Sequence, residues 1–261
     1  GFLLRYAPLK PVNSSVMPKN MNTKDNYWLA GGQKHIPHLT SAALNFTSEN
    51  GRLLRFMIYF LEKKLHDEVE RTDGATPSEE IRIPIDEGGQ LLLEMSFSRI
   101  TDNFLSFLSE LLALIYKARP EMLNSSEQER FDYIFQFKTM DELKDAVAEK
   151  RVERLAFMGL RELFEFVSKN MGLELFTTKE SFNRACEIIE YRNVITHNRG
   201  IISTISARRL EKLKDKIGSR VPINYYFVKD MQEFIENCAY DIDVRATKKF
   251  NLPAYKTPNP K

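Results

Sequence analysis

The stretch LLLEMSFSRITDNFLSFLSELLALIYKA, residues 91–118, carries the clearest folding signal in the chain. Its large apolar side chains recur every three or four residues, as they do on one face of an α-helix, at Leu93, Phe97, Ile100, Phe104, Leu108, Leu111 and Ile115. Arg119-Pro120 follows, and the residue before a proline disfavours the helical conformation. The stretch therefore predicts a long helix that ends near Ala118 and buries a continuous apolar stripe.

The same helical spacing recurs on both sides of this stretch. It predicts further helices over about 51–71, 155–171 and 225–249. Thr139 with Glu142, and Thr177 with Glu180, have the spacing of capping boxes and predict helices that begin near those residues. The second of these helices runs to about Asn198. Four or five core helices with short connections predict an all-α, up-and-down bundle.

Proline and glycine divide the chain into regions. Several prolines and the pair Gly31-Gly32 exclude long helices from residues 1–50, and residues 72–89 are typical of a loop with one short edge strand, 81–85. We expect an irregular N-terminal region over residues 1–89, which contains the helix at about 51–71. A helical bundle over 90–252 and a flexible tail over 253–261 follow it.

Composition restricts the class of protein. With 261 residues and 43% hydrophobic content the chain can bury a sizeable core, and its net charge of +2 means that an anionic partner must meet a local patch. Cys186 and Cys238 lack metal-ligand spacing, which predicts buried reduced thiols and a cytoplasmic protein. No run of about 18 apolar residues predicts a membrane span. No cluster of ligating side chains suggests a metal or a cofactor.

The stretch EYRNVITHNRG, residues 190–200, has a polar face that helix propensity does not explain. A step of about 100° per residue places Arg192, Asn193, Thr196, His197 and Arg199 within an arc of roughly 160°. The opposite side carries an apolar stripe formed by Ile188, Tyr191, Val194, Ile195 and Ile201. A solvated helix face more often carries pairs of Lys and Glu. The polar face is therefore the candidate functional site.

Arg192, Asn193 and His197 suit a phosphodiester substrate. An arginine presents a planar fork of donors to phosphate oxygens, and a neutral histidine accepts a proton near pH 7. No serine or cysteine nucleophile accompanies them in the sequence. The set therefore favours RNA cleavage, in which the substrate's own 2′-hydroxyl attacks and the protein supplies acid–base catalysis and charge stabilisation. DNA lacks that hydroxyl.

Residues 192–197, RNVITH, resemble the motif of the HEPN superfamily, in which a polar residue follows an arginine and four to six residues in all separate that arginine from a histidine. The apolar helix near Leu91 and the closing helix with Tyr225 and Phe234 also resemble that family's bundle, over roughly residues 90–252. The resemblance implies a metal-independent ribonuclease of the toxin or defence type. It further implies a homodimer whose two motif helices face each other across a shared cleft, and a neutralising antitoxin or regulatory protein as a partner.

The resemblance also assigns roles to the motif residues. Arg192 would hold the scissile phosphate, His197 would act as acid or base, and Asn193 would orient the phosphate or His197. The helix face adds Arg199 and Thr196 as RNA contacts, and the basic segment 203–220 adds Arg208, Arg209 and Lys212. Transphosphorylation needs one base and one acid, whereas the motif holds one histidine per chain, so the chemistry also favours a dimer.

Structural roles stay open for the same residues. His197 near a helix C-terminus interacts favourably with the helix dipole, and Arg192 has Glu187 and Glu190 within reach for a salt bridge. A charge-rich connector such as 203–220 is usually a solvated face. The alternative function is a non-catalytic HEPN-like module that binds RNA, a nucleotide or a protein partner.

Overall fold

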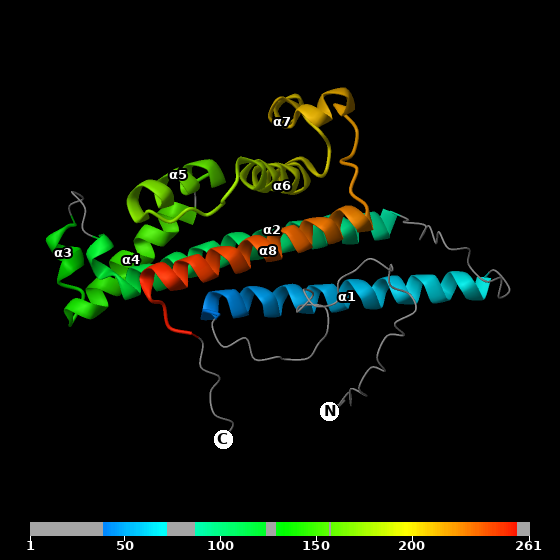
Figure 1. Ribbon diagram of the computed structural model, residues 1–261. Coiled ribbons are helices and arrows are strands. Elements are labelled where there is room, and N and C mark those ends of the chain that lie inside the picture. The colour runs from blue at the N-terminus through cyan, green and yellow to red at the C-terminus, as the bar shows by residue number, and fades with distance from the viewer. Residues whose placement is uncertain (1–38, 72–86, 124–128, 157, 255–261) are drawn as a thin grey trace, which may run out of the picture. The chain divides into compact units, whose positions relative to one another are not determined.

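The computed structural model describes residues 39–71, 87–123, 129–156 and 158–254, all within one unit of the chain, residues 36–261. Its helices are α1 (Ser41–Arg71), α2 (Glu87–Ala118), α3 (Phe131–Ile134), α4 (Met140–Ala156), α5 (Leu160–Met171), α6 (Lys179–Asn198), α7 (Thr204–Arg209) and α8 (Tyr225–Phe250), with 3-10 turns at Pro120–Leu123 and Glu211–Lys216 (Figure 1). The described residues form no strand apart from an isolated bridge between Ile201 and Arg220. The predicted all-α bundle is confirmed.

Helix α2 is the centre of the bundle, where it packs against α1, α4, α6 and α8 (Figure 1). All seven residues of its predicted apolar stripe are at most 2% exposed. Burial of one such side chain contributes about 1.5–3 kcal/mol, so this stripe is a large part of the driving force for folding. The helix ends at Ala118, as the proline at position 120 predicts.

Helix α1 begins at Ser41, about ten residues before the predicted start. Thr40 caps it, because the Ala43 amide donates to the Thr40 hydroxyl at 3.3 Å, while the Thr40 amide donates to buried Asp243 of α8 at 3.1 Å. Asn50 and Gly51, which disfavour a helix in isolation, lie inside α1. Tertiary contact with α2 and α8 therefore extends this helix beyond what its local sequence favours.

Some predicted features lie outside the described residues, namely most of the irregular region before α1, the edge strand at 81–85 and the end of the tail after residue 254.

Cys186 and Cys238 are free thiols, and both are half-buried. Burial raises the pKa of both, that of Cys238 to about 11, so each stays protonated at neutral pH. None of the described helices combines the length and apolarity needed to cross a membrane.

Helix α6 carries the candidate site, and capping interactions set both of its ends. Thr178, one residue after the predicted cap, accepts a hydrogen bond from the Ser181 amide at 3.1 Å. At the other end Arg199 and Gly200 both have left-handed backbones, with φ of 54° and 76°. Ile201, which we predicted on the apolar face of the helix, lies beyond this turn and is 40% exposed.

An ion pair between a buried carboxylate and a half-exposed arginine fixes the segment after α6 against α2. Glu94 of α2 is 2% exposed and accepts from Arg220 Nε and Nη2, each at 2.6 Å. A Cβ atom on Gly200 would lie 3.3 and 3.4 Å from the two Glu94 carboxylate oxygens. Both the positive φ and the close approach therefore require glycine at position 200.

We expect Gly200→Ala to lower the free energy of unfolding by about 1–3 kcal/mol, measured by chemical denaturation. Gly218→Ala is the matched control, because Gly218 also has a positive φ, of 82°, but has open space where a Cβ would lie. The control reports the cost of the backbone conformation alone. An equal loss in the two variants would contradict a role for the contact with Glu94.

Candidate functional site

An aromatic cluster sets the rotation of α6 about its own axis. Tyr191 is 6% exposed and packs edge-on against Phe97 of α2 at 6.4 Å and against Phe227 of α8 at 5.3 Å between ring centroids. Phe97 and Phe227 stack on each other at 5.7 Å. With Tyr191 held in the core, the residues that follow it are placed at the edge of the contact between α6 and α2.

Arg192, the arginine of the predicted motif, is held by Asp102 of α2. Its Nε donates to Asp102 Oδ1 at 2.9 Å, and its Nη2 lies 2.7 Å from the same oxygen. The Arg192 side chain is 23% exposed and that of Asp102 is 39% exposed. The guanidinium is therefore positioned by a partly screened ion pair and still has access to solvent.

Asn193 follows Arg192 on α6, and their side chains are in contact. Arg192 Nη1 donates to Asn193 Oδ1 at 3.2 Å. A guanidinium has five N–H donors, and the contacts to Asp102 and Asn193 use at most three of them. At least two donors thus stay available for the oxygens of a bound anion.

His197 is exposed near the C-terminal end of α6. It makes no hydrogen bond with any described residue. The spacing of five residues separates its direction from that of Arg192 by about 140° around the helix axis. The structure therefore places the two residues on one helix, about one and a half turns apart, and does not bring them into contact within one chain.

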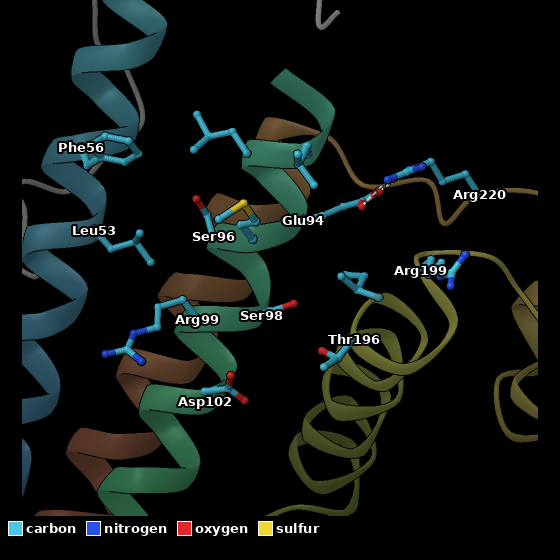
Figure 2. A pocket seen from close by; sticks show the side chains of 14 residues that line it. Leu53, Phe56, Glu94, Ser96, Ser98, Arg99, Asp102, Thr196, Arg199 and Arg220 are labelled. Carbon is cyan, nitrogen blue, oxygen red and sulfur yellow. Dashed lines mark hydrogen bonds and ion pairs between the residues drawn. The ribbon is translucent and has the colours of Figure 1, made fainter. Parts of the chain in front are cut away.

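Thr196 and Arg199 line a groove that we call the α2 groove (Figure 2). It has a volume of about 600 Å³. The other residues that line it are Leu53 and Phe56 of α1, Leu91, Leu92, Glu94, Met95, Ser96, Ser98, Arg99 and Asp102 of α2, Ile195 of α6, and Arg220. Arg199 reaches it from the left-handed turn after α6, so its place depends on that turn and not on the helix face used in the prediction.

Two of the three predicted basic RNA contacts pair with acids of α6. Lys212 Nζ donates to the Glu187 carboxylate at 3.0 and 3.1 Å, and Arg209 Nη1 lies 3.3 Å from both Glu190 oxygens. These pairs fasten the basic segment to α6, and they involve the two acids that we considered as partners of Arg192. Arg208 is exposed and has no ion pair with a described residue.

Sequence reasoning missed Asp102 and Glu94, which connect α2 to the site. Both carboxylates belong to the helix that the apolar pattern marked as core, and Asp102 is 90 residues away from Arg192. The only local sign that α2 contributes to the site was the presence of acidic residues, such as Asp102, outside its apolar stripe. In the described residues no three His, Cys, Asp or Glu side chains gather in the way a metal site requires.

We expect Arg192 and Asp102 to show a coupling free energy of about 1 kcal/mol in a double-mutant cycle of alanine variants, measured by chemical denaturation. The exposed pair Arg130 and Asp132, joined at 2.7 Å, is the matched control and should show coupling near zero. Equal coupling in the two pairs would mean that Asp102 does not hold Arg192 in solution.

Comparison with known proteins finds no protein-family model, no curated protein and no solved structure that matches the chain. The resemblance to the HEPN superfamily therefore rests on the RNVITH motif and on the helices around it. What the chain does must be inferred from the geometry of Arg192, Asn193 and His197.

Proposed function

We propose that the chain is a metal-independent RNA endonuclease, in which α6 supplies half of a composite site and a second copy supplies the other half. The observation that carries this proposal is the solvent-accessible guanidinium of Arg192, oriented by Asp102 and Asn193, on the same helix as exposed His197. A cytoplasmic role in a toxin–antitoxin pair or in phage defence, with an antitoxin or regulatory protein as partner, follows from the resemblance.

In this mechanism the RNA 2′-hydroxyl oxygen attacks the adjacent phosphorus and loses its proton to neutral His197 of one copy. The bond from phosphorus to the 5′-oxygen breaks, and the leaving oxygen takes a proton from protonated His197 of the other copy. The products are a 2′,3′-cyclic phosphate and a 5′-hydroxyl. The free donors of Arg192 stabilise the charge that develops on the phosphate oxygens.

The angle between Arg192 and His197 on α6 supports a site shared by two copies. Side chains that diverge by about 140° on one helix cannot both point directly at one phosphorus. Two antiparallel copies of α6 would place Arg192 of one chain near His197 of the other. Such a closed pair also provides the two imidazoles that acid and base catalysis require.

The ion pair between Asp102 and Arg192 favours a second candidate function. A carboxylate 2.7 Å from the guanidinium offsets part of its charge, so a phosphate must compete with Asp102 for it. A module that binds RNA, a nucleotide or a protein partner without cleaving it would tolerate this competition. In that case His197 contributes to binding and not to proton transfer.

We expect RNA cleavage by the pure protein to persist in excess EDTA and to stop in two variants. His197→Ala should lower the rate constant about 10²–10⁴-fold through loss of proton transfer, and Arg192→Ala should lower it about 10²–10³-fold through loss of charge stabilisation. Single-turnover cleavage of labelled RNA measures both. Arg184→Ala, at an arginine of α6 that pairs with Asp230, is the matched control and should cut normally. Binding without cutting would favour the non-catalytic module.

We expect the protein to sediment as a dimer at concentrations at which it cuts RNA. If wild-type and His197→Ala subunits exchange freely, the activity of a mixture should fall with the square of the wild-type fraction, because each site needs two histidines. A linear fall of activity with the wild-type fraction, or a monomer that cuts RNA, would rule out a site shared by two copies. Neither result would contradict the nuclease function itself.

A further inference from the structure

The α2 groove is continuous with the candidate site. Thr196, which lines it, directly precedes His197, and Asp102, which lines it from α2, is the residue that holds Arg192. Figure 2 shows Thr196 and Asp102 on facing helices, with the groove extending from them along α2. A polymer bound at Arg192 and His197 thus meets this groove next. Its volume of about 600 Å³ lies within the range of small-molecule pockets.

The side chains that line the groove carry more positive than negative charge. Of its three arginines, Arg220 is neutralised by Glu94, and the remaining carboxylate, Asp102, is neutralised by Arg192. Arg199 has no ion pair with a described residue, and Arg99 has only Glu49 at 4.0 Å, with 61% of its own side chain exposed. The groove therefore offers two guanidiniums to an anionic ligand.

The wall between these arginines is apolar and accessible. Phe56 of α1 is 54% exposed, and Leu91 and Met95 of α2 are 53% and 61% exposed. Ser96 in the same wall is 1% exposed, and its hydroxyl has no hydrogen-bond partner in the described part of the chain. The exposed side chains of this wall suit a ligand with a flat or apolar face, and Ser96 adds one unpaired hydroxyl at the edge of the wall.

We propose that the α2 groove holds an unpaired nucleotide of single-stranded RNA next to the scissile phosphate, with its base against Phe56 and Met95 and with successive backbone phosphates at Arg99 and Arg199, which Figure 2 shows on opposite sides of α2. This inference rests on the proposed nuclease function and names the substrate as unpaired RNA. Recognition of a splayed base by an aromatic face and arginines is how proteins commonly bind single strands. A double helix keeps its bases stacked and cannot place one in the groove.

The test measures the affinity of the full chain for a mixed-sequence 2′-fluoro RNA about 12 nucleotides long, which lacks the attacking hydroxyl, by fluorescence anisotropy. Phe56→Ala should raise Kd about 5- to 150-fold, because stacking of one base contributes about 1–3 kcal/mol. Arg99→Gln should make the slope of log affinity against log salt concentration less negative by about 0.7, because one phosphate contact is lost. These side chains are exposed, so neither change should unfold the protein.

Phe131→Ala and Arg130→Gln are the matched controls, since Phe131 is 77% exposed and the Arg130 side chain 85% exposed at the start of α3, outside the groove. Their affinity and salt dependence should equal those of the wild type. A single abasic nucleotide, placed at each position of the probe in turn, should abolish the effect of Phe56→Ala at one position only. That result identifies the base that contacts the groove.

Three outcomes would overturn the inference. Wild-type affinity in Phe56→Ala and Arg99→Gln, while the wild type still cuts unmodified RNA, rejects the groove but keeps the nuclease. Dissociation of a dimer by these variants, with RNA affinity lost only as dimer is lost, assigns the groove to a second copy of the chain. If the wild-type protein neither binds the probe nor cuts RNA, both the proposed function and this inference are ruled out.

Discussion

The packing of Phe97, Tyr191 and Phe227 decides which residues of α6 face α2. Each aromatic pair of this kind contributes about 0.5–1.5 kcal/mol beyond the burial of its surface, and the three rings belong to three different helices. Because Tyr191 immediately precedes Arg192, the rotation that buries the phenol also presents the guanidinium to Asp102. A rotation of α6 that exposed Tyr191 would break both the core and the ion pair.

Several basic side chains near α6 form ion pairs with acidic residues of α6 and α2. The acids Glu187 and Glu190 bind Lys212 and Arg209, and Glu94 binds Arg220, so three cations secure the segment that follows the helix. These pairs leave no net charge, so in a chain with a net charge of only +2 the local excess of positive charge comes from other arginines. The excess resides on Arg199 and Arg99 in the groove and on Arg208 beyond it. An anionic partner would therefore be attracted to these arginines of α2, α7 and the turn after α6, and not to the molecule as a whole.

In the proposed ribonuclease, the groove and the motif residues would perform separate tasks. Cleavage by the 2′-hydroxyl requires the nucleotide to leave helical stacking, because the attacking oxygen must align with the leaving oxygen across the phosphorus. An apolar wall beside the site can hold the unstacked base while Arg192 holds the phosphate. Asp102 borders both places, so a nucleotide in the groove would lie beside the residue that holds Arg192.

Sequence alone determined the helical class, the buried stripe of α2, the end of α2 before Pro120 and the polar face of α6, because these follow from periodicity and from the chemistry of single residues. It misplaced the start of α1, which depends on the contact of Thr40 with Asp243, and it put Ile201 on a helix that stops at Asn198. Only the tertiary structure decided that Arg192 pairs with Asp102 and that Thr196 lines a groove. Arg192 and Asp102 lie 90 residues apart, and Arg220 and Glu94 lie 126 apart. No local pattern records which acid meets which base once helices pack.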